Sequence, residues 1–356
     1  MKIKDLLKFR TLLLILFVST TMILGSCKDD EPTIIEGDKT ALTALIVEAD
    51  ALSASATAVD YPQNYIDVYK ATLKTVKDAN ATKLTQVQIN NLVTQLTLAT
   101  ATFKTQAYGF IDEALYLNAG WHFDEGTGTT ATAFSTVKHL GTFKAGNAGV
   151  FGANAMSPTW VAGVKGGKAI YLNNGAHLEV PYTTAFLPAN ITISVWVKPI
   201  ELYENNYIVS QNFWNGYKLQ TQGGGKPFFT YKKGTDSYVN VDNEVDNSVK
   251  VNVWTHIVVS VNSTAKVLKI YVNGTLTKTW TETAGGIAPF IQTLTDPSPQ
   301  PFIIGCVATD AQLATWTWTE TPISLGYFKG AIDELKIYNT ALDNGQVSRL
   351  YTNEKP

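Results

Sequence analysis

Cysteine and charge are both scarce in this sequence. The chain of 356 residues has only two cysteines, Cys27 and Cys306, which excludes a metal site built on cysteine clusters. Charged residues make up 16% of the chain and the formal net charge is −2, so the basic surface typical of nucleic-acid-binding proteins is missing. His122, His139 and His177 show no metal-ligand spacing.

Threonine, asparagine, glycine and aromatic residues are plentiful instead. This composition is typical of secreted β-structure, and the length suffices for a large domain and a small one. Cys306 lies in an apolar run from Phe302 to Val307, where we expect a buried, unreactive thiol.

Residues 1–26 have the features of a secretory signal peptide. A basic head precedes an apolar run from Leu12 to Leu24, and small residues follow. The run is short and interrupted by threonine, which favours a signal peptide over a membrane span. Its ending, Leu24-Gly25-Ser26-Cys27, resembles the lipobox of bacterial lipoproteins. The resemblance implies that Cys27 is lipidated and begins the mature protein; the alternative is a plain signal peptide with an incidental cysteine.

Residues 27–38 are predicted to form the lipid anchor and a tether. The acidic cluster Lys28–Glu31 resembles the export signal of Bacteroidetes surface lipoproteins, although a short charged run is also typical of a solvated tether. We therefore expect an outer-membrane lipoprotein that faces the exterior, with retention in the periplasm as the alternative. With Cys27 lipidated, Cys306 has no intrachain disulfide partner.

Residues 39–107 are predicted to form a three-helix bundle. Apolar residues recur at helical spacing in three segments, beginning near Leu42, Ile66 and Ile89. Thr85 to Gln88 has the pattern of a capping box at the start of the third helix. The bundle resembles a helical spacer module of bacterial surface proteins.

Residues 109–356 change to a period of two, which predicts β-strands. Ile191 to Val197 and Thr255 to Val261 alternate between apolar and other residues, and Asn273-Gly274 suits a type I′ hairpin turn. The predicted fold class is therefore mainly β: a two-sheet antiparallel β-sandwich, or jelly roll, preceded by the small three-helix bundle. On the strands, Trp196, Tyr271 and Tyr338 are expected on an outer sheet face, as a ligand surface or as a surface that loops cover.

Several segments of this β region resemble the laminin-G-like (LamG) jelly-roll family of the concanavalin A-like lectin and glucanase superfamily. They are, in family order, Gly120–Gly128, Gly166–Leu172, His177–Pro181, Ile191–Pro199, Trp254–Val258, Tyr271–Gly274 and Phe328–Asn339. The resemblance implies the fold, whereas function depends on sites that differ among members of one fold. It also implies that His256, on a strand in a family-typical position, is structural.

Because the superfamily includes glucanases, we looked for paired carboxylates. Asp242, Glu244 and Asp246 alternate, but Asn247 or Ser248 stands where a second catalytic glutamate is required, so a solvated loop is predicted. Asp333 and Glu334 are neighbours in a strand and are expected on opposite faces. The sequence also lacks a Gly-x-Ser-x-Gly nucleophile motif. These patterns favour a protein that is not an enzyme.

The LamG resemblance implies a structural calcium ion at the rim of the sandwich, held by carboxylates and backbone carbonyls. Asp124 and Asp333 are the best matches to the acidic positions of the family's first and last strands. The alternative is that both carboxylates cap turns without a metal. No other cofactor is expected.

Sugar recognition requires flat aromatic rings and hydrogen-bonding side chains. Trp316 and Trp318 lie two residues apart in a polar loop and could form a stacking platform, or could cover a sheet face or pack on the helical bundle. A second group mixes aromatic rings with amides around one hairpin: Tyr203, Phe213, Trp214 and Asn215.

The sequence therefore predicts a surface lipoprotein that binds an extracellular polysaccharide or oligosaccharide without cleaving it, near a glycan importer or degradative enzymes. An adhesin that binds host or matrix protein is the alternative, and a glycan-cleaving enzyme is the third class.

Overall fold

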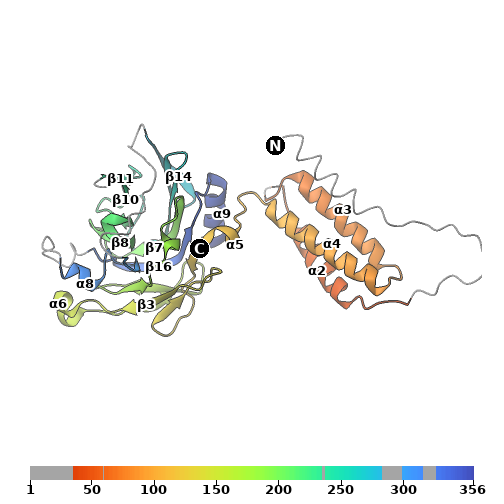
Figure 1. Cartoon of the computed structure of the whole chain (residues 1–356), viewed down its shortest axis with the longest axis horizontal. Helices are drawn as coiled ribbons and strands as arrows, with labels where there is room; N and C mark the ends of the chain where they lie inside the picture. Colours follow the sequence, from red (N-terminus) through yellow and green to blue (C-terminus); the bar gives the residue numbers. More distant parts are fainter. Residues whose placement is uncertain (1–34, 59, 235–236, 283–298, 316–325) are drawn as a thin grey trace, which may run out of the picture. The chain divides into compact units, whose positions relative to one another are not determined.

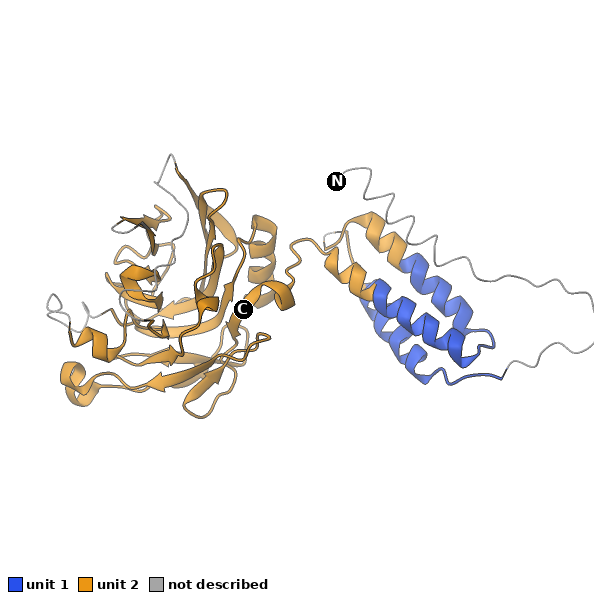
Figure 2. Ribbon diagram, viewed as in Figure 1, with its two compact units in different colours: residues 1–54, 70–99 blue, residues 55–69, 100–356 orange. Residues whose placement is uncertain are grey.

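We analysed the fold in a computed structural model of the chain, which describes residues 35–58, 60–234, 237–282, 299–315 and 326–356. The chain divides into two compact units (Figure 2). One unit comprises Met1–Ala54 and Lys70–Ala99, and the other comprises Ser55–Tyr69 and Thr100–Pro356. Cys27, Trp316 and Trp318 lie outside the described residues.

The helices of the N-terminal region are α2 (Thr40–Ser55), α3 (Gln63–Asn80) and α4 (Gln86–Thr105), which confirms the predicted three-helix region (Figure 1). The predicted capping box begins α4: the Thr85 backbone N–H donates to the Gln88 side chain at 2.8 Å, and the Gln88 N–H donates to the Thr85 hydroxyl at 3.4 Å. Within the first unit, Lys77 pairs with Asp50 at 2.8 Å. None of the helices in the described ranges is long and apolar enough to cross a membrane.

The rest of the second unit is a sandwich of two antiparallel sheets, as predicted. Sheet A contains, in spatial order, β14 (Thr275–Thr281), β13 (Val267–Val272), β12 (Thr255–Asn262), β7 (Ile191–Pro199), β16 (Gly330–Tyr338), β5 (Lys168–Leu172) and β4 (Thr159–Ala162), and β1 (Leu117–Trp121) also pairs with β16. Sheet B contains β11 (Ser237–Asp242), β10 (Pro227–Gly234), β9 (Tyr217–Thr221), β8 (Asn206–Gln211), β15 (Phe302–Ile304), β6 (His177–Val180), β3 (Leu140–Lys144) and β2 (Thr130–Thr132).

Helical segments precede, connect and follow these strands. They are α5 (Glu113–Tyr116), α6 (Ala148–Phe151), η1 (Gly152–Asn154), η2 (Thr184–Phe186), η3 (Phe213–Asn215), α8 (Asp310–Leu313) and α9 (Asn344–Glu354). The predicted hairpin turn joins β13 to β14, and both Asn273 and Gly274 have positive φ, 50° and 73°, as a type I′ turn requires.

The core lies between the two sheets. Aliphatic and aromatic side chains from both inner faces, such as Ile193, Val259 and Phe229, have no solvent exposure. The predicted burial of Cys306 is confirmed, and burial raises the pKa of its thiol. Because alternate residues of each strand fill this core, the intervening residues form two outer faces.

Candidate functional site

A row of polar side chains crosses the outer face of sheet B. Its members lie directly opposite one another on adjacent strands: Ser210 of β8 pairs with Lys218 of β9, Lys218 with Thr230 of β10, and Thr230 with Asn240 of β11. The preceding or following residues point into the core, so these four side chains share the outer face. We call these four residues the polar row.

The η3 turn contributes aromatic residues beside this row. Asn212 and Phe213 both have positive φ, 53° and 46°, a backbone conformation that side-chain-bearing residues rarely adopt. Trp214 follows and is 38% exposed, and its ring meets the rings of Phe213 and Tyr238 edge-on at 5.3 and 5.1 Å. The turn therefore places an exposed indole ring at the edge of the polar row.

Lys218 lies beneath these rings and is only 3% exposed. Its ammonium lies 3.4 Å from the centre of the Trp214 ring and 4.7 Å from that of Phe213, and it donates to the Tyr207 hydroxyl at 3.2 Å. Burial lowers the pKa of Lys218 to about 7. The faces of the aromatic rings attract the charged form, because their quadrupoles are negative at the face.

A second lysine, Lys232 of β10, lies at the other side of the η3 turn and is 8% exposed. Its ammonium donates to the Asn215 side-chain oxygen at 2.6 Å. Among the described residues, no carboxylate lies within ion-pair distance of Lys218 or Lys232. Within the described ranges, two buried lysines therefore face this site without a carboxylate partner.

Further polar atoms at this site have no hydrogen-bond partner within the described part of the chain. They are the Ser210 hydroxyl and both side-chain atoms of Asn212, all buried. Buried polar atoms in proteins are nearly always hydrogen-bonded, so an unpartnered group of this size indicates a place for water or ligand.

An open cavity of about 480 Å³ adjoins the other end of the row. Asn240 lines it together with Phe228, Trp280 and the predicted loop carboxylates Asp242, Glu244 and Asp246. Lys226 pairs with Asp242 at 3.2 Å and with Asp246 at 3.5 Å, and Lys278 pairs with Glu244. The three carboxylates therefore take part in ion pairs with lysine.

The structure brings three of the predicted glycan-binding residues together: Phe213, Trp214 and Asn215 form the η3 turn. Tyr203 is not part of this turn: it is 9% exposed, and its hydroxyl donates to the backbone oxygen of Tyr327. Sequence reasoning missed Ser210, Lys218 and Lys232, although their alternation with apolar neighbours indicates the outer face.

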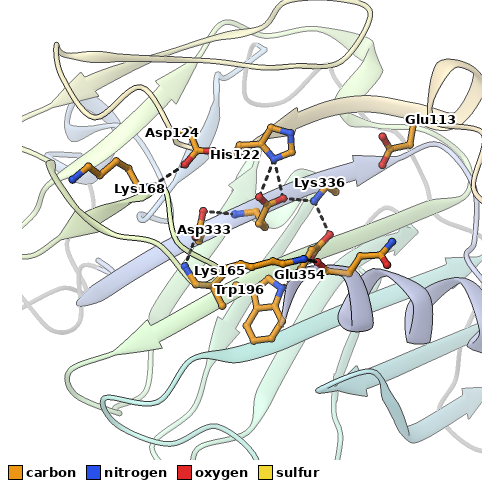
Figure 3. Close-up of polar contacts among 12 residues, drawn as sticks. Glu113, His122, Asp124, Lys165, Lys168, Trp196, Asp333, Lys336 and Glu354 are labelled. Atoms are coloured by element: carbon orange, nitrogen blue, oxygen red, sulfur yellow. Dashed lines mark hydrogen bonds and ion pairs between the residues drawn. The ribbon is translucent and has the colours of Figure 1, made fainter. Parts of the chain in front are cut away.

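Asp124 and Asp333, the predicted calcium ligands, accept hydrogen bonds from the backbone at the start of β5 and of the β4–β5 connection, respectively (Figure 3). The Lys168 N–H donates to Asp124 at 2.7 Å, and the Val164 N–H donates to Asp333 at 2.7 Å. The second Asp333 oxygen accepts from the Glu334 N–H at 2.9 Å, and burial raises the pKa of Asp333 to about 7.

These contacts are those of carboxylates that cap turns, which is the alternative role considered for both residues. Within the described ranges, no group of three or more His, Cys, Asp or Glu side chains is placed to hold a metal ion. Calcium binding at Asp124 and Asp333 stays a prediction.

The expectation that Asp333 and Glu334 lie on opposite faces is wrong. The register of β16 against β7 shifts between Asp333 and Lys336, and Glu334 has a positive φ of 46°, which marks a β-bulge. Asp333 lies opposite Trp196 on the outer face of sheet A, and Glu334 contacts Lys336 on that same face. Simple alternation fails because the bulge adds a residue to one strand.

The aromatic residues expected on the outer face of sheet A are covered. Trp196, Tyr271 and Tyr338 are almost completely buried, and α9 packs over them: Tyr351 stacks on Trp196 at 5.7 Å. Glu354 at the end of α9 accepts from the Trp196 indole N–H at 2.9 Å and from Lys336 at 2.7 Å (Figure 3). This face is therefore a docking surface for the chain's own helix. His256, in the same cluster, donates to or accepts from the Ser194 hydroxyl at 2.8 Å.

The family model described as "Concanavalin A-like lectin/glucanases superfamily" matches residues 172–348. The matched residues lie in the β-sandwich, which is similar in sequence to this superfamily. A comparison with curated protein sequences gave no match. The superfamily assignment agrees with the two antiparallel sheets and does not by itself select a ligand.

Solved structures to which the chain is similar include domain 4 of AbnA, a GH43 extracellular arabinanase from Geobacillus stearothermophilus (20% identity, TM-score 0.47, 67% of this chain and 100% of that chain). The binding domain of Paraclostridial Mosquitocidal Protein 1 has 18% identity and a TM-score of 0.46 over 67% of this chain and 52% of its own. The binding domain of botulinum neurotoxin serotype D/C has 14% identity and a TM-score of 0.45 over 67% and 52%. The chain thus spans about half of each toxin domain. Because each TM-score lies below 0.5, these similarities support no statement about function.

Proposed function

We propose that this protein is a non-catalytic surface lipoprotein that binds extracellular glycan on the outer face of sheet B. The observation that carries the proposal is the exposed Trp214 ring beside the polar row. A pyranose ring presents apolar C–H faces to an aromatic ring and hydroxyl groups to amides and hydroxyls. Trp214 supplies the stacking surface, and Asn212, Asn215 and Ser210 supply hydrogen-bonding groups.

The arrangement favours capture over cleavage. A retaining glycosidase requires two carboxyl groups about 5–5.5 Å apart that flank the scissile bond. Asp242, Glu244 and Asp246 in the cavity that adjoins the polar row are instead paired with lysines. A lipid anchor at Cys27 would hold the captured glycan at the cell surface, near enzymes or an importer, and the helices would act as a spacer.

A glycan array with the protein from Lys28 onward tests the proposal. We expect wild-type protein to bind and the Trp214→Ala variant to lose at least about tenfold in affinity, since an aromatic stacking contact is lost. Tyr108→Ala is the matched control, because Tyr108 is another exposed aromatic residue of the second unit, 54% exposed, outside the sandwich. A Trp316→Ala/Trp318→Ala variant tests the alternative platform, and EDTA tests calcium.

Binding that disappears only in the Trp316→Ala/Trp318→Ala variant would contradict the placement at Trp214. Loss of binding in EDTA would support a calcium ion in or beneath the site. No binding to any glycan would contradict the proposed function itself and would favour the adhesin alternative, so that protein partners would be sought next.

A further inference from the structure

The site proposed on sheet B contains two buried lysines that have no carboxylate partner among the described residues. Lys218 and Lys232 lie on adjacent strands at either side of the η3 turn, both are more than nine-tenths buried, and neither has a carboxylate partner in the described chain. Burying an uncompensated ammonium is costly, so lysines that have only a structural role are normally paired. Their partners here are a phenol oxygen, an amide oxygen and aromatic rings.

Polar side-chain atoms near the two lysines also lack hydrogen-bond partners within the described chain. Both Asn212 side-chain atoms and the Ser210 hydroxyl lack partners within the described residues, and Ser210 lies directly opposite Lys218 on the same face. The Ser210 hydroxyl and the Asn212 amide can donate to an anion, whereas the Asn212 oxygen needs a donor such as a sugar hydroxyl. A ligand that satisfies all of them combines a negative charge with hydroxyl groups.

We propose that this site binds an acidic sugar, with the carboxylate of a uronic or sialic acid between Lys218 and Lys232 and the sugar ring against Trp214. This inference rests on the proposed function and adds the class of glycan. Charge-assisted hydrogen bonds from two ammonium groups would neutralise the buried charges, and the Asn212 and Ser210 side chains would complete the contacts. Trp214 is the exposed residue over Lys218, so a ligand that reaches this ammonium touches the ring.

Isothermal titration of the protein from Lys28 onward tests the assignment. The acidic probes are tetragalacturonic acid and sialyllactose, and each is compared with its own methyl ester. Lactose serves as the neutral sugar, and a sulfated oligosaccharide serves as an anion without a carboxylate. We expect at least one free acid to bind about tenfold or more tightly than its methyl ester, because the ester removes a charge-assisted interaction.

Substitutions of the two lysines test whether these residues cause the preference for the acid over its ester. In Lys218→Met and Lys232→Met, the free acid should bind about tenfold more weakly and its advantage over the ester should shrink or vanish. Lys144→Met is the control, since Lys144 of β3 belongs to the same sheet but pairs with Glu179 at 3.4 Å. Lys218→Arg keeps the charge and should retain the preference for the acid. Thermal unfolding of every variant verifies that it is folded.

The outcomes separate this inference from the proposed function. Equal binding of acid and ester, preferential binding of lactose, or a preference for sulfate over carboxylate would overturn the acidic-sugar assignment and leave glycan binding in place. An acid preference that persists in Lys218→Met and Lys232→Met would overturn the location. If neither neutral nor acidic glycan binds, the proposed function fails as well.

Discussion

At the residue scale, Lys218 combines features that rarely occur together. It is a lysine almost without solvent exposure, its ammonium faces aromatic rings, and no carboxylate of the described chain neutralises it. Lysine is seldom fully buried unless it is paired. A buried ammonium without a carboxylate partner lowers the free energy of unfolding. Residues that lower stability but serve binding are typical of functional sites.

This loss of stability is testable through pH. Burial lowers the pKa of Lys218 from 10.5 to about 7 in the folded protein, so between these values the unfolded chain binds more protons. The free energy of unfolding of wild type should therefore rise with pH from about pH 7 to pH 9.5, relative to Lys218→Met, by at most about 1.4 kcal/mol per pH unit. Below pH 7 the folded protein holds the buried charge and the full penalty applies.

Urea denaturation at several pH values measures the difference. Lys226→Met is the comparison, because the carboxylate of Asp242 raises the pKa of Lys226, so its removal should not reproduce the rise. A difference between wild type and Lys218→Met that stays constant over the range would show that Lys218 remains charged in the folded protein.

At the scale of elements, the polar contacts that dock α9 form a connected network on the outer face of sheet A (Figure 3). Lys336 is paired with Glu334 and Glu354, and Glu354 also binds the Trp196 indole. Burial works against ionisation of Glu334, but its hydrogen bond with His122 and the Lys336 ammonium lower its pKa to about 2. The bulge in β16 positions Glu334 for both contacts.

Removing one carboxylate from this network should be far more costly than removing an exposed one. Glu354→Ala leaves the Trp196 N–H without its partner and weakens the pairing of a buried ammonium, so we expect a loss of about 3–5 kcal/mol in the free energy of unfolding. Glu282→Ala is the control: its pair with Lys266, at 2.8 Å, is about half exposed and should contribute less than about 1 kcal/mol. Urea denaturation followed by circular dichroism measures both, and similar losses would contradict a structural role for the network.

Elements with local signals were predictable from the sequence, whereas the β-bulge was not. Thr85 to Gln88 contains both partners of its capping box, and Asn273-Gly274 supplies the two residues that tolerate positive φ, so each element is specified within a few residues. The bulge at Glu334 depends on contacts with distant residues such as His122, which local periodicity does not report.

At the scale of the whole molecule, the sandwich could be predicted because alternation, turns and family resemblance agree over many strands. The candidate site was predicted in part. The aromatic residues of the η3 turn stand next to one another in the sequence, whereas Ser210, Lys218 and Lys232 meet only through strand register. Burial of Lys218 also depends on the rings of Phe213 and Trp214 that cover its ammonium, and strand periodicity alone does not indicate that contact.

The proposed location of the molecule depends on Cys27, which lies outside the described residues. If Cys27 carries lipid, wild-type protein should remain with outer membranes after a carbonate wash, whereas Cys27→Ser should be recovered in the soluble fraction, because acyl chains supply roughly 0.8 kcal/mol of membrane affinity per buried methylene group. Protease added to intact cells should digest wild-type protein if it faces the exterior. Replacing Asp29, Asp30 and Glu31 by their amides separates anchoring from export: the variant should stay in the membrane but become protected from protease. Equal fractionation of wild type and Cys27→Ser would exclude the lipid anchor, and unchanged protease sensitivity of the amide variant would exclude the acidic cluster as the export signal.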